Sequence, residues 1–264
     1  MTVKDELCNK FLTQNFIEND ELNNCLSHYR SVAASYAQIE NAIAVLSDLK
    51  ERVSYVYYGG IAEHLGIGIP GECRRISSIW EDDVFSIFTH SDMEKRHIDE
   101  LRFLHFLKSI PLKLKQHYYL NSILRAGNRH KGQFCIRHRV FYVGYQPNGS
   151  VRLALCLYNA SLGADENASI INTLTGEITP LQQHDCGDLL SEREKAVLKL
   201  IDEGKISKEI SHSLSISIHT VNRHRQNILA KLNVSNSIEA CRIATAMGLS
   251  LIHISEPTRL DVIS

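Results

Sequence analysis

Residues 217–233 carry side chains whose types and spacing could read nucleic acid. A helix here, at about 100° per residue, would gather four aliphatic residues on one face: Ile218, Val221, Ile228 and Leu232. The opposite face and its flanks would hold donors and acceptors and no carboxylate: His219, Asn222, Arg223, Gln226 and Asn227. An α-helix fits the major groove of B-DNA, where arginine can pair with guanine, and asparagine or glutamine with adenine. The pattern alone leaves a DNA-reading face and an ordinary solvated face equally open.

The charge distribution along the chain favours the first interpretation. The 264 residues have a formal net charge of −1. Leu189–Gly248 nevertheless holds nine Lys and Arg against six Asp and Glu, and Ile210–Ile238 contains no acidic residue. A basic segment on a slightly acidic body is what a DNA-binding appendage needs, although many solvated helix faces are also basic.

Local signals predict four helices around this segment. Ser191 and Glu194 have the spacing of a capping box, and Gly204 is placed to end the helix that they open. A second, short helix is expected from near Ser207 to Leu214. Ser217 can cap the third helix, which runs to Asn233. The fourth is expected over about 236–247, opened by an Asn-x-x-Glu pattern.

The segment from Leu190 to Gly248 resembles the LuxR/GerE-type helix-turn-helix domain. The residues that carry the resemblance are Leu190-Ser191, Arg193-Glu194, Val197-Leu198, Gly204, Lys208-Glu209-Ile210, Leu214, Ile216-Ser217, Thr220-Val221, His224, Asn227-Ile228 and Lys231-Leu232. The resemblance implies that the second and third helices form the helix-turn-helix, that the third enters the major groove, and that the fourth makes a dimer contact. Asn222 stands where family members commonly have lysine, which leaves the base preference open.

The DNA contacts that we expect fall into two groups. Base edges would be contacted by Asn222, Arg223 and Gln226. Phosphates would be contacted by Lys208, Thr220, Arg225 and Lys231, for each of which an ordinary surface or capping role is the alternative. His224 lies near the buried stripe and is expected to help pack the helix against its neighbours and not to contact DNA.

The first two-thirds of the chain have a mixed α and β pattern. The first 50 residues have helical spacing, and Asp92–Leu107 is a second expected helix. The predicted strands are rich in β-branched and aromatic residues: Val53–Tyr58, Tyr118–Leu124, Phe134–Tyr145, Val151–Tyr158, Ile170–Thr173 and Glu177–Thr179. The expected fold class is therefore α+β, with an antiparallel sheet followed by an all-α four-helix domain.

Trp80–Asp92, followed by a helix and three antiparallel strands, resembles the second half of a PAS-type sensor domain. The whole arrangement is similar to LuxR-type regulators of Bacteroides-like bacteria with a PAS-like front domain. By this analogy the sheet and its helices would enclose a small pocket or offer a dimer surface. The expected limits are a helical segment (1–50), a PAS-like sensor or dimerisation domain (51–180), a linker (181–188), the helix-turn-helix domain (189–248) and a non-native tail (249–264).

Enzyme sites find little support. The Gly66–Gly71 segment matches the G-x-G-x-x-G pattern of dinucleotide-binding proteins, but it does not follow a predicted strand as that motif requires. His90, Asp92 and His97 could be imagined as metal ligands, but cap and surface roles fit their context better. No neighbouring pattern marks Cys73, Cys135 or Cys156 as a nucleophile. We therefore expect no enzyme, no metal and no cofactor.

The sequence as a whole predicts a bacterial transcription factor that binds double-stranded DNA as a homodimer. No apolar run is long enough to span a membrane, so we expect a cytoplasmic protein without membrane contact. RNA polymerase and a small-molecule effector of open identity are further candidate partners. The alternative is an interaction protein whose helical module contacts RNA polymerase or a partner regulator, and an enzyme using the front domain comes third.

Overall fold

The computed structural model describes residues 3–17, 21–128, 132–161, 167–181, 190–232, 234 and 236–246. The chain divides into two compact units, residues 1–184 and 185–264. Of the expected linker, only Leu181 lies among the described residues, and the expected tail lies outside them.

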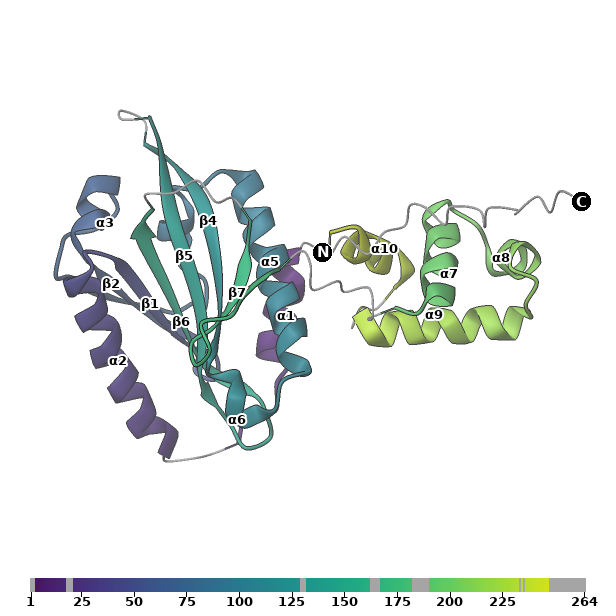
Figure 1. Cartoon of the computed structure of the whole chain (residues 1–264), viewed down its shortest axis with the longest axis horizontal. Coiled ribbons are helices and arrows are strands. Elements are labelled where there is room, and N and C mark those ends of the chain that lie inside the picture. The colour runs from purple at the N-terminus through teal and green to yellow at the C-terminus, as the bar shows by residue number, and fades with distance from the viewer. Residues whose placement is uncertain are drawn as a thin grey trace, which may run out of the picture. The chain divides into compact units, whose positions relative to one another are not determined.

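The first unit is built on one antiparallel sheet (Figure 1). Its eight described strands are β1 (Ile43–Asp48), β2 (Val53–Tyr58), β3 (Cys73–Ile76), β4 (Tyr118–Asn128), β5 (Gly132–Tyr145), β6 (Val151–Ala160), β7 (Ser169–Asn172) and β8 (Ile178–Pro180). They lie in the order β3-β2-β1-β6-β5-β4-β7-β8, and every neighbouring pair is antiparallel. The mixed α and β class with an antiparallel sheet is confirmed.

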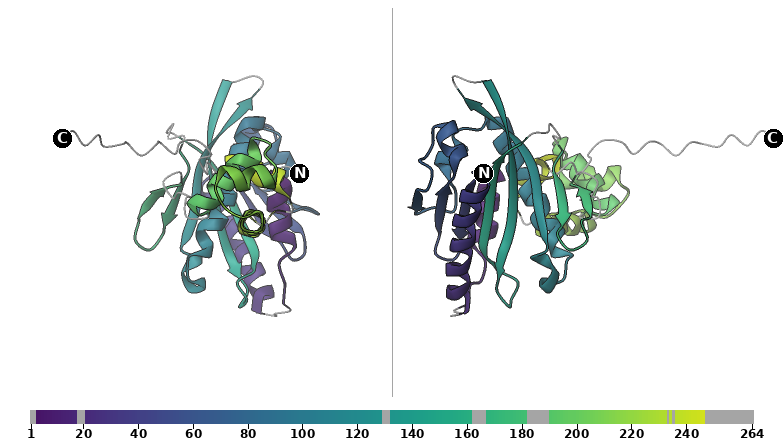
Figure 2. Two further views of the ribbon diagram at one scale, coloured as in Figure 1. Left: turned by 90° about the vertical axis from the view of Figure 1, so that its right-hand side faces the viewer. Right: turned by 60° about the vertical axis from the view of Figure 1, so that its left-hand side comes forward.

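Helices cover both faces of this sheet, as Figures 1 and 2 show. Those of the first unit are α1 (Val3–Leu12), α2 (Glu21–Ile39), α3 (Gly60–Leu65), α4 (Asp82–Phe85), α5 (His90–Lys108) and α6 (Leu112–Lys115). On one face, Ala33 and Ala37 of α2 pack against Leu46 of β1 and Leu155 of β6. On the other face, α5 packs against β4 and α1 packs against α5.

The expectation that the first 50 residues are helical is wrong at its end. Ile43–Asp48 forms β1, which pairs with β2 in register from Ile43↔Tyr58 to Asp48↔Val53. Asn41 adopts a left-handed backbone with φ 51° and breaks the helical path after α2. All six residues of β1 are buried, so the apolar run is one of a strand buried on both faces. The expected boundary at residue 50 falls inside the β1–β2 hairpin.

The second unit is helical over its described residues. Its helices are α7 (Glu192–Asp202), α8 (Ser207–Ser213), α9 (Ile218–Leu232) and α10 (Ser237–Ala246). Ser191 and Glu194 form the predicted capping box, and Gly204 follows α7 with φ 79°. The core is made by the apolar faces of all four helices: Val197, Leu198, Ile210, Val221, Ile228, Leu232, Ala240 and Ile243. In the described part of the chain, no helix has the length and apolar content needed to cross a membrane.

Candidate nucleic-acid interface and buried polar cluster

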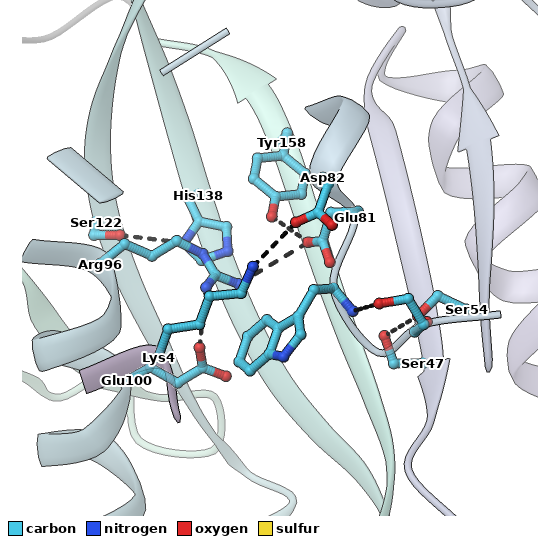
Figure 3. A network of polar contacts seen from close by, with 12 residues as sticks. Lys4, Ser47, Ser54, Glu81, Asp82, Arg96, Glu100, Ser122, His138 and Tyr158 are labelled. Carbon is cyan, nitrogen blue, oxygen red and sulfur yellow. Dashed lines mark hydrogen bonds and ion pairs between the residues drawn. The ribbon is translucent and has the colours of Figure 1, made fainter. Parts of the chain in front are cut away.

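Two groups of side chains, one in each unit, have chemistry beyond packing. In the first unit a charged cluster lies beneath the sheet, on the face covered by α5 (Figure 3). Arg96 of α5 is 1% exposed, and its Nη1 lies 3.3 Å from Oε2 of Glu100. Its Nη2 lies 3.9 Å from Oε1 of Glu81, which precedes α4. The guanidinium also lies over the ring of Phe85, with 4.7 Å between its Cζ and the ring centroid.

Side chains from the central strands complete this cluster. The Tyr158 hydroxyl donates to Glu81, and the Tyr142 hydroxyl donates to Glu100 at 3.1 Å. His138 is fully buried, stacks on Tyr158 and lies 3.4 Å from the Ser122 hydroxyl through its Nδ1. Arg96 Nε and His138 Nε2 have no hydrogen-bond partner among the described residues. Two nitrogen atoms of the cluster therefore lie inside the core without a hydrogen bond.

Burial dominates the ionisation of this cluster. It raises the pKa of the Glu81 carboxyl, and the Arg96 guanidinium and Tyr158 hydroxyl only partly oppose that rise. Burial and the charge of Arg96 hold the pKa of His138 well below its usual value. Burial, with Arg96 and Lys4, also lowers the pKa of His97 to about 3. Both histidines are therefore neutral near pH 7.

The residues considered as metal ligands have structural partners instead. Asp92 is buried at the start of α5, where it binds the Thr89 hydroxyl and Arg125. His97 packs edge-on against Trp80. Within the described ranges, no group of three His, Cys, Asp or Glu side chains could hold a metal ion.

In the second unit, α9 is fixed by a cap and by its apolar face. The Ser217 hydroxyl accepts a hydrogen bond from the Thr220 amide at 3.0 Å, as the sequence predicts. Val221, Ile228 and Leu232 are buried, and α9 contacts α7, α8 and α10. The placement of Ile218 on the buried face is wrong. It is the first residue of α9 and is 47% exposed, so the buried stripe begins at Val221.

The opposite face of α9 is exposed, as the helical wheel predicts. It presents five polar side chains: His219, Asn222, Arg223, Gln226 and Asn227. No residue between Ile218 and Leu232 is acidic. Lys208, at the start of α8, is exposed as well. This surface can donate hydrogen bonds to an acceptor-rich partner and carries no carboxylate to repel a polyanion.

Residues 188–244 match the family model described as bacterial regulatory proteins, luxR family. The C-terminal unit is a LuxR-family helix-turn-helix domain. Three of the curated relatives that match part of the chain are named here. The chain is 44% identical over 63 residues to an uncharacterized response regulatory protein, YgeK, of Escherichia coli (strain K12). It is 46% identical over 59 residues to the regulatory protein SdiA of the same organism, and 51% identical over 51 residues to the transcriptional regulatory protein DesR of Bacillus subtilis (strain 168).

These matches cover 24%, 22% and 19% of the chain, and 43%, 25% and 26% of the relatives. The chain therefore spans less than half the length of the curated relatives it matches. Among solved structures, the phage VqmA–DPO complex aligns with 86% of this chain and 91% of its own, at 14% identity and a TM-score of 0.28. Escherichia coli SdiA aligns over 95% and 98%, at 16% identity and a TM-score of 0.27.

Two of the predicted phosphate contacts also have partners on other helices of the LuxR-family domain. The half-buried Arg225 donates from Nη1 to the Ser207 hydroxyl at 3.1 Å and from Nη2 to the Ser237 hydroxyl at 3.0 Å. Lys231 Nζ lies 2.6 Å from Oε2 of Glu194, which is 3% exposed. Both side chains therefore join α9 to its neighbouring helices, and their phosphate contacts stay predictions.

Glu194 of the LuxR-family domain has a second role that its sequence context does not predict. It caps α7 through Ser191 and also pairs with Lys231 of α9. Burial alone would raise the pKa of its carboxyl, but hydrogen bonds from Lys231 and Ser191 outweigh burial and lower it. The capping-box spacing predicts the contact with Ser191, whereas nothing in the sequence marks the contact with Lys231, 37 residues away.

Proposed function

We propose that this chain is a bacterial, DNA-binding transcriptional regulator that acts in the cytoplasm and whose helix α9 reads the major groove. The observation that carries the proposal is the exposed, carboxylate-free face of α9 within a LuxR-family domain. A duplex presents phosphates and acceptor-rich base edges, and this face offers the matching donors. The function requires no catalysis and no cofactor.

The proposed DNA contacts fall into two groups, those to base edges and those to phosphates. Asn222, Arg223 and Gln226 contact base edges. Lys208, Thr220, Arg225 and Lys231 contact phosphates, the last two in addition to their contacts within the domain. The protein would bind as a homodimer, with its two α9 helices on half-sites about one helical turn apart.

For the first unit we propose a PAS-like sensor or dimerisation domain that sets the placement of the two reading helices. Helix α5 followed by the antiparallel strands β4, β5 and β6 supports it, because the PAS resemblance implies that sequence of elements. The buried cluster around Arg96 supports a sensing role, since a small polar effector could satisfy its unpartnered atoms. An effector acts only if its affinity differs between the two arrangements of the dimer.

A mobility shift with the full chain and duplex genomic fragments, over a series of salt concentrations, tests the proposal. Affinity should fall steeply with salt, with a log–log slope of about −0.9 for each phosphate contact. Absence of any salt-dependent binding would overturn the proposal. Capture of RNA polymerase by the same preparation would then favour the interaction-protein alternative.

A further inference from the structure

The middle of the chain is a long stretch without acidic residues. Residues 101–164 contain no Asp or Glu and ten Lys or Arg, whereas residues 1–100 contain seventeen acidic residues and nine basic ones. The ten are Arg102, Lys108, Lys113, Lys115, Arg125, Arg129, Lys131, Arg137, Arg139 and Arg152. Such a stretch can attract a polyanion wherever its cations are left unpaired in the fold.

Four of the arginines are paired within the first unit. Each has a carboxylate oxygen at 3.2–3.5 Å, in the pairs Arg102–Asp99, Arg125–Asp92, Arg139–Glu40 and Arg152–Asp48. Lys108, Lys113 and Lys115, by contrast, form no ion pair with any described residue. The first two are exposed, and the half-buried Lys115 holds its Nζ 5.9 Å from the centroid of the Tyr145 ring. These three cations are therefore left without a carboxylate.

The three lysines follow one another closely where α5 ends. Lys108 is the last residue of α5, and α6, which holds Lys113 and Lys115, begins shortly after it (Figure 1). Burial, and then the charges of Lys108 and Lys10, lower the pKa of His105 in the last turn of α5. The positive charge in this region is therefore strong enough to act on a neighbouring side chain. We call Lys108, Lys113 and Lys115 the basic end.

We propose that the basic end binds the phosphate backbone of the duplex outside the base pairs that α9 reads. The inference rests on the proposed DNA-binding function and adds a second DNA contact, in the first unit. A lysine ammonium is a point charge that neutralises a phosphate without reading sequence. Because both units belong to one chain, a duplex held by α9 meets the basic end at a high effective concentration, so a few weak contacts add affinity.

The composition of the basic end favours DNA over other anionic partners. Lysine is depleted in protein–protein interfaces, whereas it is one of the residues that make phosphate contacts in protein–DNA complexes. An anionic membrane would require an amphipathic helix with a broad apolar face. Helix α6 has only four residues, and Leu114 is its one exposed leucine.

The experiment measures the affinity of the full chain for two duplexes over a series of salt concentrations. One is the preferred site from selection with randomised DNA, trimmed to the bases that influence binding. The other carries the same site with about two helical turns of added duplex on each side. The unaltered protein should bind the extended duplex more tightly and with the steeper dependence on salt.

The decisive variant combines Lys108→Gln with Lys113→Gln, which removes the two exposed cations of the basic end. On the extended duplex its log–log salt slope should be less steep by about 1.8 per protomer, since each lost phosphate contact contributes about 0.9. On the trimmed duplex it should bind as the parent does.

The matched control combines Arg75→Gln with Arg137→Gln. Both arginines are exposed, lie on β3 and β5, and form no ion pair with a described residue. The control removes two positive charges from another part of the same unit and should keep the parent's slope on both duplexes. An unchanged fluorescence transition of Trp80 in all three proteins shows that the first unit is folded.

The outcomes distinguish this inference from the function on which it rests. If the unaltered protein binds neither duplex, the proposed function fails. If the lysine variant keeps the parent's slope on the extended duplex, DNA binding stands and the basic end has no part in it. An equal change of slope in the lysine variant and the arginine control would assign the effect to net charge and overturn the inference. Capture of RNA polymerase lost only in the lysine variant, with unchanged slopes, would assign the basic end to an acidic protein surface instead.

Discussion

The N-terminal unit buries an arginine, two glutamates and two histidines beneath one face of its sheet, whereas the C-terminal unit keeps most of its cations at the surface of its helices. Arg96 lies among aromatic rings and two carboxylates, and Arg223 faces solvent. A buried ion pair is held by the whole core around it, and an exposed cation is free to meet a partner. The contrast is that the first unit holds charge inside its core, whereas the second keeps charge at its surface, where a partner can reach it.

The largest expected effect comes from breaking the buried cluster. Arg96→Met removes the only guanidinium between Glu81 and Glu100 and leaves two carboxylates in the core, which should lower the free energy of unfolding of the first unit by about 3–5 kcal/mol. The protein has a single tryptophan, Trp80, which packs against His97 in this unit. Its fluorescence in a denaturant titration therefore reports this unit alone.

The matched control is Arg137→Met, an exposed arginine on β5. It should leave the tryptophan transition in place. Equal midpoints for both variants would mean that the cluster contributes no more than a surface charge, and the contrast between the units would be lost.

A smaller effect is expected from the ion pair of the second unit. Lys231→Met leaves the buried Glu194 with only its Ser191 contacts, and because the lysine is partly exposed the loss should be about 1–2 kcal/mol. Circular dichroism at helical wavelengths should show the change, with Trp80 fluorescence unaffected. Lys199→Met, on the exposed side of α7, is the control. The same loss in both variants would contradict a specific role for the pair.

The pH dependence of the first unit is the smallest effect. The folded unit holds His97 and His138 neutral below their usual pKa of 6.5, while the unfolded chain binds protons there. Stability from these histidines is therefore present above pH 6.5 and lost as the pH falls. Asp99, whose pKa is raised by burial to about 6, and Glu81 offset part of this loss. The free energy of unfolding of the first unit should therefore fall by about 1 kcal/mol between about pH 7 and about pH 6.

Tryptophan-monitored denaturation at the two pH values measures this decrease. A transition midpoint that stays constant or rises on acidification would show that the two histidines accept protons in the folded state. The cluster would then be open to water, in contrast to the burial of both histidines in the folded unit.

Sequence signals that act over a few residues predict the second unit well. The capping box at Ser191, the glycine after α7 and the apolar stripe of α9 each involve neighbours within about two helical turns. Six of the eight described strands of the first unit follow from β-branched and aromatic runs for the same reason, whereas β1 and β3 were not predicted. The expected helix across Ile43 failed because a buried strand and a helix share apolar spacing over so short a run.

Contacts between distant parts of the chain could not be predicted in this way. Glu81, Arg96 and Tyr158 meet only because the fold brings the residue before α4 and a residue of α5 against a residue of β6, and no motif joins them in sequence. The ties of Arg225 to Ser207 and Ser237 are of the same kind, since they depend on how α8 and α10 pack on α9. The helical position of a basic side chain in a predicted reading helix therefore does not by itself show whether the side chain contacts DNA or packs within the domain.

The affinity of Arg223→Ala for a duplex selected by the unaltered protein tests the central claim most directly. Arg223 is exposed on α9, and its removal should cost about 1–3 kcal/mol of binding free energy at that site and relax discrimination at the base pair it contacts. Arg193→Ala, an exposed arginine on α7, should bind as the parent does. Unchanged affinity and unchanged base preference in Arg223→Ala, with both proteins folded, would contradict the assignment of α9 as the reading helix.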